Sequence, residues 1–428
     1  MKSSRTVRLA GALLAPVLIA GAAVAQAGAA SADTNSHGGR VLYVSKSAKP
    51  YNSDKSCRSA KFKTIGSAVA AARAGGTVIV CPGTYHEQVA ISKPLTLTGQ
   101  RAVIDQTGVT PTFQVTLPGL GTQTIYAGVV IVSSHVTLSG FTIRNAQGEG
   151  VLAAGLGGTI RDVTISHNAV VNNDTGSTVP PSSPYFQCAA EGQVPGDCGE
   201  GVHFAGNIAD STIRGNFIAH NSGGVLMSDD VGPNHDNVVE NNVVTGNQSD
   251  CGITVPGHNP GALNAEGVPQ PQVAGVYDNV IRNNVVTGNG TTGDGAGVLF
   301  ANASAGTASY DNLVEDNYIA GNGLSGVTMH AHTVGPGEFE DLSGNVIVHN
   351  VFGKNNLLGD PLDGPPGPSD MQTTAVLVYS GGTKVTVKIA RNYIFNNSIG
   401  IWLSSPVKAS GLRTNTFRNV ATPISANH

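Results

Sequence analysis

The chain has 428 residues, of which 40% are hydrophobic and only 12% are charged, with 56 glycines and a formal net charge of −4 at pH 7. This length could hold about two or three ordinary domains. However, the scarcity of charge and the many glycines argue against long amphipathic helices and favour short strands joined by tight corners. The small negative charge, with no basic cluster, argues against a nucleic-acid surface.

The N-terminus carries the pattern of an export signal. Three basic residues precede an apolar run at 9–25. This pattern predicts a secretory signal peptide over residues 1–32, with the small residues 30–32 as the cleavage site and 25–27 as the alternative. No later run is long and apolar enough to span a bilayer. We therefore expect a secreted, extracellular protein without membrane insertion.

Residues 33–105 predict an N-terminal cap and the first coils. A strand is expected at 41–44, followed by a helix at 62–73, whose apolar residues follow helical spacing. Strands at 77–81 and 95–99 come next. A helix laid over the first coil would cover the open end of a stack of strands.

A repeated motif organises the rest of the chain. The sequence Asn-Asn-Val-Val-Thr-Gly-Asn occurs at 241–247 and again at 283–289. A relaxed form, with two asparagines five residues apart, recurs at Asn168/Asn173, Asn216/Asn221, Asn242/Asn247, Asn284/Asn289, Asn317/Asn322, Asn345/Asn350 and Asn392/Asn397. A short strand precedes most copies, and a strand beginning with glycine follows them. Three short strands per repeat predict one coil of an all-β parallel β-helix over residues 106–428, with asparagines hydrogen-bonded along the stack.

The opening of this region resembles a known superfamily. Residues 64–87 and 93–99 are similar to the first coils of secreted right-handed parallel β-helix repeat proteins. That superfamily includes pectate lyases, polygalacturonases, alginate epimerases and the non-enzymatic NosD-type periplasmic proteins. The resemblance implies a right-handed parallel β-helix with an N-terminal helical cap, and it covers nearly all of the chain after the signal peptide.

Longer segments interrupt the repeats at 174–199, 256–275, 302–309, 331–342 and 353–374. Most of them leave the repeat just after a glycine-led strand or its equivalent corner. Insertions stacked at one corner would build walls beside one face, and we expect function on that face.

Carboxylates stand at the corners that enter the glycine-led strands. Glu149, Glu200, Asp250 and Asp294 align there, which predicts a column along the stack. Two carboxylates about 5 to 9.5 Å apart are what a glycosidase requires. The segment 249–253 loosely resembles the Asp-Asp-Cys segment of polygalacturonases, but the other motifs of that family do not occur in the expected order. The alternative is that these carboxylates accept backbone N–H bonds at tight turns.

A second group lies where the same strands end: Asp229, Asp230, His258, His330 and His332. Brought together from neighbouring coils, these residues would form an acid–base cluster or a metal site. We expect either no cofactor or calcium, which is the first metal to test because carboxylates and loop carbonyls are hard oxygen ligands. The alternative is a set of solvated loop residues. For elimination chemistry, Lys354 and Arg391 are further candidate bases.

Two more columns follow from the alignment of the coils. The outward position two residues after each strand glycine holds Leu152, His203, Leu226, Thr254, Leu299, Thr328, Leu377 and Trp402. Among these, His203 is a candidate substrate contact. Trp402, with the nearby Tyr379, is expected either to stack on sugar rings or to cover the C-terminal coil. Another position holds Arg214, Glu240, Arg282 and Glu315, whose alternating signs predict pairing between neighbouring coils.

Five cysteines in an exported chain predict disulfides. We expect Cys57–Cys81 across the cap and Cys188–Cys198 within one loop, with Cys251 as a small buried residue.

The sequence thus predicts a secreted β-helix protein that cleaves a polysaccharide. The reaction is hydrolysis through Glu200, Asp250 and Asp294, or elimination at the cluster around Asp229 and Asp230. Two alternatives remain: a non-catalytic protein that binds a glycan or another protein, and a NosD-like accessory protein with a metal-related role. The substrate and the oligomeric state stay open.

Overall fold

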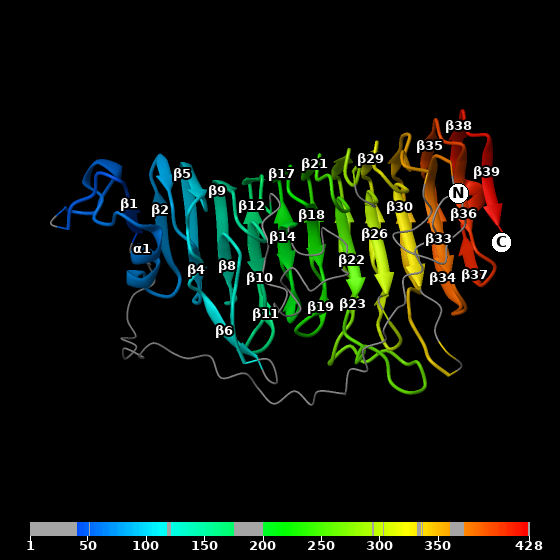
Figure 1. Cartoon of the computed structure of the whole chain (residues 1–428), viewed down its shortest axis with the longest axis horizontal. Helices are drawn as coiled ribbons and strands as arrows, with labels where there is room; N and C mark the ends of the chain where they lie inside the picture. Colours follow the sequence, from blue (N-terminus) through cyan, green and yellow to red (C-terminus); the bar gives the residue numbers. More distant parts are fainter. Residues whose placement is uncertain are drawn as a thin grey trace, which may run out of the picture.

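The computed structural model describes residues 41–426 except 51, 118–120, 175–199, 293–294, 303, 332–334, 336 and 360–371. The described residues form one elongated stack of coils that runs in chain order from the N-terminal to the C-terminal end (Figure 1). Three parallel sheets run along this stack. The predicted right-handed parallel β-helix is confirmed.

The largest sheet, sheet A, has 21 strands, because from β12 to β35 most coils contribute two strands to it. In the coil of Asn242, the strands β20 and β21 are separated by a corner in which Asn241 adopts a φ of 56°. The strands of sheet A are β1 Val41–Val44, β2 Gly76–Val80, β3 Gly83–Tyr85, β5 Leu95–Asp105, β9 Val136–Arg144, β12 Thr164–Ser166, β13 Ala169–Val171, β16 Thr212–Arg214, β17 Phe217–Ala219, β20 Val238–Glu240, β21 Val243–Thr245, β24 Val280–Arg282, β25 Val285–Thr287, β28 Leu313–Glu315, β29 Tyr318–Ala320, β31 Asn345–Val348, β32 Val351–Phe352, β34 Val385–Ala390, β35 Tyr393–Phe395, β37 Val407–Ser410 and β38 Thr416–Arg418.

Sheet B has 11 strands, one from each coil, and they follow one another along the stack in chain order. These are the predicted glycine-led strands and their equivalents in the first and last coils. Sheet B comprises β4 Val89–Ile91, β8 Val129–Ile131, β10 Val151–Ala153, β14 Glu200–Phe204, β18 Gly223–Met227, β22 Ile253–Gly257, β26 Val298–Asn302, β30 Val327–Ala331, β33 Thr374–Ser380, β36 Ile399–Leu403 and β39 Thr422–Ala426.

The middle coils carry a fourth short strand that the sequence pattern did not predict. These strands form sheet C, which lies between the end of each sheet B strand and the start of the next sheet A strand: β11 Ile160–Arg161, β15 Ile208–Ala209, β19 Asn234–His235, β23 Val276–Tyr277 and β27 Ser309–Tyr310. The remaining strands, β6 Gln114–Leu117 and β7 Gly121–Thr124, form an antiparallel hairpin.

Asparagine ladders run inside the corners of the stack, as predicted. In the ladder of Asn242, its backbone N–H donates to Oδ1 of Asn284 at 3.0 Å, and its own Nδ2 donates to the carbonyl of Ile213 at 2.9 Å. Each buried amide therefore satisfies backbone groups of the coils on either side. The predicted pair Asn345/Asn350 is wrong for its first member. Asn345 lies in register with Asn312, in a separate ladder at the end of sheet C.

Apolar side chains from all three sheets fill the interior in columns. Val202, Val225, Ile253, Val298 and Val327 occupy equivalent positions on successive strands of sheet B and are fully buried. A single coil has no second layer to cover these side chains, so the stack as a whole provides the core.

The cap covers the N-terminal end of the core. Its helix α1 spans Ile65–Ala71, two residues short of the predicted end, and Thr64 caps its first turn. The carboxylate of Glu87 accepts the N–H bonds of Ile65 and Gly66, both at 2.8 Å. Two short 3₁₀ helices, Cys57–Ser59 and Leu412–Thr414, lie near the two ends.

The predicted disulfide Cys57–Cys81 is present in the cap. Cys188 and Cys198 lie outside the described residues. Cys251 is buried, and its sulfur accepts the N–H bond of Ala296 at 3.1 Å. Over the described ranges, no helix has the length and apolar character needed to cross a membrane.

Candidate acid–base cluster on the outer face of sheet B

The outward-facing column of sheet B is in the register that the sequence predicted. Leu152 lies beside His203, His203 beside Leu226, and the column continues to Leu377 beside Trp402. Four of its apolar members belong to clusters separate from the main core: Leu152, Leu299, Leu377 and Trp402. Nevertheless, every side chain in this column is buried. The outer face of sheet B is therefore a covered surface.

The corner carboxylates depart from the predicted column. Glu149 and Glu200 occupy neighbouring positions, but the next position is Gly223, which pairs with Glu200. Asp250 lies one residue earlier, opposite Ser222, and its Oδ1 accepts the N–H bond of Cys251 at 2.6 Å. Asp294 lies outside the described residues. The predicted continuous column is thus reduced to the pair Glu149 and Glu200.

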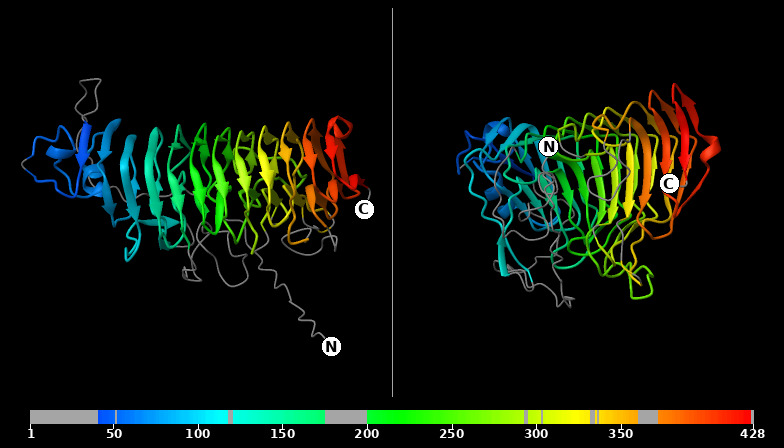
Figure 2. Two further views of the ribbon diagram at one scale, coloured as in Figure 1. Left: turned by 90° about the horizontal axis from the view of Figure 1, so that it is seen from above. Right: turned by 45° about the vertical axis from the view of Figure 1, so that its right-hand side comes forward.

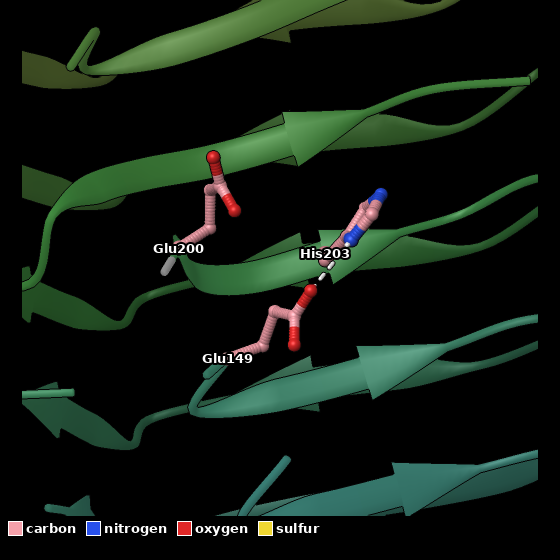
Figure 3. Close-up of side chains that lie close together, drawn as sticks. All are labelled: Glu149, Glu200 and His203. Atoms are coloured by element: carbon pink, nitrogen blue, oxygen red, sulfur yellow. Dashed lines mark hydrogen bonds and ion pairs between the residues drawn. The ribbon is translucent and has the colours of Figure 1, made fainter. Parts of the chain in front are cut away.

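The carboxyl groups of Glu149 and Glu200 lie close to the ring of His203 (Figure 3). Nδ1 of His203 lies 3.2 Å from Oε1 of Glu149, and the facing atoms of Glu149, Glu200 and His203 all lie within 4.8 Å of one another. All three side chains are at most 1% exposed. Burial raises the pKa of Glu149, and the hydrogen bond and charge of His203 partly oppose this rise.

The second ring nitrogen of His203 points to the next coil. Its Nε2 lies 2.9 Å from the hydroxyl of Ser228 and 3.5 Å from Oδ2 of Asp230. Burial alone would lower the pKa of His203, but hydrogen bonds and charges of Asp230 and Glu149 outweigh burial and raise it. His203 therefore lies between the carboxyl groups of Glu149 and Asp230 and joins the coils of β10, β14 and β18.

Asp230 connects this buried group to the surface. Its Oδ1 lies 2.8 Å from Nδ1 of His258, at the end of β22, and its Oδ2 accepts the hydroxyl bond of Ser228 at 2.7 Å. Burial would raise the pKa of Asp230, but the charges and hydrogen bonds of His258 and His203 lower it overall. The His258 side chain is 27% exposed, so it is the accessible member of the cluster.

The neighbouring Asp229 has a different role. Its two carboxylate oxygens accept the backbone N–H bonds of His258, Asn259 and Gly275, at 2.7 to 3.0 Å. These bonds clamp both ends of the 256–275 insertion. Burial raises the pKa of Asp229 to about 6 despite these bonds. Its contacts are those expected of a turn carboxylate that accepts backbone N–H groups.

The other predicted site residues do not join this cluster. His330 is buried on β30 in register with Tyr379, and His332 lies outside the described residues. Trp402 is 5% exposed and packs on Leu377, so its contacts are those of a cover over the C-terminal coils. Lys354 lines a separate open pocket of about 900 Å³, whereas Arg391 is an exposed corner residue with a φ of 57°.

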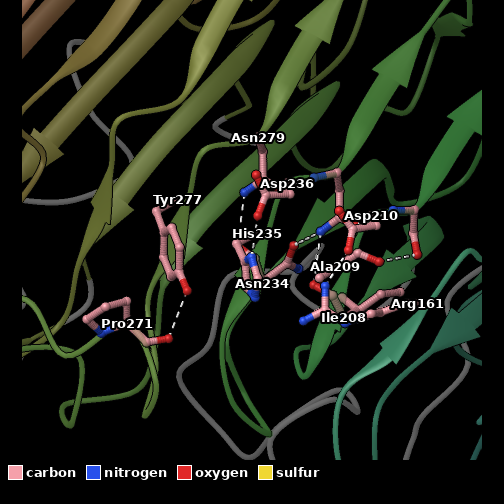
Figure 4. A network of polar contacts seen from close by, with 12 residues as sticks. Arg161, Ile208, Ala209, Asp210, Asn234, His235, Asp236, Pro271, Tyr277 and Asn279 are labelled. Carbon is pink, nitrogen blue, oxygen red and sulfur yellow. Dashed lines mark hydrogen bonds and ion pairs between the residues drawn. The ribbon is translucent and has the colours of Figure 1, made fainter.

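A second histidine–aspartate pair lies at the end of sheet C (Figure 4). His235 Nδ1 is 2.7 Å from Oδ2 of Asp236, and the His235 ring stacks on Tyr277 with the ring centroids 4.9 Å apart. Tyr277 donates to the carbonyl of Pro271 at 2.8 Å and stacks in turn on Tyr310. This pair therefore belongs to an aromatic stack of His235, Tyr277 and Tyr310.

Within the described ranges, one group has the spacing of a metal site: Glu149, Glu200 and His203. Its donors are two carboxylates and one imidazole, and both ring nitrogens of His203 are held by the neighbouring side chains. Calcium prefers oxygen ligands alone, so this group does not fit the expected cation.

Sequence reasoning did not anticipate two members of the cluster. Glu149 stood in the predicted column but had no assigned partner, and Ser228 had no signal at all, since a serine after an apolar strand is common. The outward position of His203 together with a glutamate in the preceding coil was the available signal for Glu149.

These features define a parallel β-helix repeat protein with a buried acid–base cluster, and the predicted resemblance to that class is confirmed. Residues 50–261 match the model of DUF1565, a protein family of unknown function. No curated protein sequence matches the chain.

Solved structures similar to this chain share its fold at low sequence identity. The A-module of the mannuronan C-5 epimerase AlgE4 from Azotobacter vinelandii is 16% identical, with a TM-score of 0.48, over 84% of this chain and 92% of the epimerase module. Pectate lyase Pel9A is 15% identical, with a TM-score of 0.45, over 82% and 78% of the two chains. An alginate lyase from Paenibacillus sp. is 12% identical, with a TM-score of 0.47, over 91% and 99%.

Proposed function

We propose that the protein cleaves a uronate-containing polysaccharide by β-elimination outside the cytoplasmic membrane, with His258 as the proton acceptor. One observation carries the proposal: the partly exposed His258 ring is held through Nδ1 by the buried carboxylate of Asp230, at 2.8 Å. The proposal rests on these contacts and on the sequence signal for export, not on the likeness to polysaccharide-active enzymes.

The chemistry follows from the protonation states. An ionised Asp230 favours the His258 tautomer that carries its proton on Nδ1, which makes Nε2 the proton-accepting atom. Nε2 takes the proton from C5 of the uronate, the electron pair forms the C4–C5 double bond, the glycosidic C4–O bond breaks, and water protonates the leaving oxygen. The lowered pKa of Asp230 keeps this carboxylate ionised. His203 and Ser228 hold the opposite side of Asp230 and act as positioning residues. General base catalysis of this kind contributes a factor of about 10² to 10⁴ in rate.

Elimination is favoured over hydrolysis because, of the carboxylates predicted for hydrolysis that the structure describes, Glu200 is fully buried and Asp250 is out of register with it. The cluster is acidic, so the uronate carboxylate of the substrate needs a neutralising cation. We propose calcium for this purpose, held by the carboxylate and hydroxyl oxygens of the substrate and not by the buried group of Glu149, Glu200 and His203.

The test is an assay of the secreted protein on neutral and uronate polysaccharides, with calcium and with a chelator. We expect absorbance of unsaturated uronate that depends on calcium. His258→Asn should lower the rate by roughly 10²-fold or more. The matched control is His235→Asn, which removes a histidine–aspartate pair outside the cluster and should leave the rate unchanged. New reducing ends without unsaturation would instead identify a hydrolase.

A second candidate is non-catalytic glycan binding. It is favoured by the open pocket near the C-terminal end, which is lined by Lys354 and by the amides of Asn356, Asn396 and Asn419, with the exposed Leu357 at its side. Amides and a lysine suit the hydroxyl and carboxylate groups of an acidic glycan. Binding of polysaccharides that is lost in Lys354→Ala, without any product formation, would favour this candidate.

A further inference from the structure

The outer face of sheet A carries a column of exposed apolar side chains. Phe217, Val243, Val285 and Tyr318 are 38 to 44% exposed and lie in direct register on β17, β21, β25 and β29. Figure 2, left, views the molecule from the side on which these strands lie in Figure 1. Exposed apolar residues normally scatter, so a continuous column indicates a contact surface.

A charged column runs beside the apolar one. Arg214, Glu240, Arg282 and Glu315 lie in register on β16, β20, β24 and β28. Within the chain, Arg282 Nη2 lies 2.8 Å from Oε2 of Glu240. The order of charges along the stack is therefore positive, negative, positive, negative.

We infer that this face binds a second copy of the chain, antiparallel, about a two-fold axis that lies in the interface along the strand direction. The axis falls between the coils of Val243 and Val285. This axis reverses the order of the coils in the partner, and each column lies opposite the same column of the partner. Arg214 then faces the partner's Glu315, and Glu240 faces the partner's Arg282. In the apolar column, Phe217 faces the partner's Tyr318.

The charge order selects this arrangement among the ways of pairing the two faces. When the order of four alternating charges is reversed, each charge lies opposite one of the other sign. The same patch can therefore pair with itself, which is the condition for an isologous two-fold contact. A parallel arrangement, with the two-fold axis along the stack and through the charged column, would place Arg214 on the partner's Arg214 and Glu240 on the partner's Glu240. Like charges directly opposite one another are destabilising.

The proposed axis also lies at the middle of the stack. The eight coils from Thr142 to Tyr393 lie symmetrically about it, four on each side.

The first test is the mass of the full chain by sedimentation at tens of micromolar. We expect a dimer, and we expect Val285→Lys to weaken dimerisation at least tenfold, because it places a charge beside the axis. The control is Val268→Lys, which changes a valine that is 51% exposed in the 256–275 insertion, away from this face. A monomer at all concentrations, or a dimer that Val285→Lys leaves intact, overturns the inference.

Cross-linking tests the orientation. In the antiparallel dimer, position 217 faces position 318 of the partner, whereas two copies of position 217 are about three coils, roughly 14 Å, apart. A mixture of Phe217→Cys and Tyr318→Cys proteins should therefore form a disulfide-linked dimer on oxidation, and neither variant should do so alone. Cross-linking of each variant alone would overturn the antiparallel arrangement.

Charge reversal gives the third test. Glu240→Lys opposes the partner's Arg282 and should weaken the dimer, and the double variant Glu240→Lys with Arg282→Glu should restore it. Because the double variant also restores the pair within the chain, thermal unfolding of the monomer at low concentration serves as the control for folding. A double variant that folds normally and remains monomeric contradicts the proposed contacts.

Discussion

The outer faces of sheets A and B are both built from short parallel strands whose residues lie in register along the stack. The outward apolar side chains are nevertheless exposed to solvent on sheet A and buried on sheet B. Leu299 on sheet B is 4% exposed, whereas Val285 on sheet A is 39% exposed. Three insertions, 256–275, 302–309 and 331–342, follow the ends of sheet B strands, and two, 174–199 and 353–374, lie between a sheet A strand and the next sheet B strand. The corners within sheet A, in contrast, are short and occupied by asparagine. Where a chain places its insertions thus decides which face can hold buried acid–base groups and which can meet a partner.

The largest expected effect tests this difference in burial between the two outer faces directly. Leu299 packs with Cys251, Ala296 and Leu324, so Leu299→Lys should lower the free energy of unfolding by at least about 4 kcal/mol. Val285→Lys should cost less than about 0.5 kcal/mol, since its side chain is solvent-exposed. Urea unfolding at low protein concentration measures both in the monomer. Similar costs for the two variants would show that the outer face of sheet B is open in solution.

A smaller effect distinguishes the buried ladder asparagines at the corners from the exposed asparagines beside them. Asn284 donates to Val239 and Asn317 and accepts from Asn242, so Asn284→Ala leaves several buried backbone and amide groups unsatisfied. We expect a loss of about 3 kcal/mol in the free energy of unfolding.

Its neighbour Asn283 provides the control. It is exposed with a φ of 54°, so Asn283→Ala should cost only about 1 kcal/mol, from the left-handed backbone alone. Equal losses for the two variants would mean that the ladder contributes no more than corner geometry.

The repeat made the ladders and the outward column predictable, because both depend only on spacing within one coil. Long-range register was harder to predict. Gly224 lies three positions after Asn221, but Gly252 lies five positions after Asn247, and the longer corner shifts Asp250 out of the column of Glu200. Asn345 satisfied the five-residue spacing by coincidence and belongs to another ladder.

From the sequence, His258 and Asp230 could be predicted to lie near each other, but not to form a hydrogen bond. The sequence put both residues at the same end of adjacent strands of sheet B. Their hydrogen bond, however, depends on the path of the 256–275 insertion, which Asp229 clamps through three backbone N–H groups. A carboxylate that fixes a loop and one that orients a histidine look alike in a sequence.

The smallest effect we expect concerns pH and tests whether His203 is charged in its buried position. Its pKa is raised by Asp230 and Glu149, so the stabilisation that it provides is fully present below its unfolded pKa, about 6.5, and is lost as the pH rises through its folded pKa. His203→Gln keeps the approximate volume but removes the charge. The difference in free energy of unfolding between wild type and His203→Gln should therefore be largest near pH 6 and shrink towards pH 9. A difference that grows with pH would mean that His203 is buried in its neutral form, and the proposed alignment of Asp230 would then lack its charged partner.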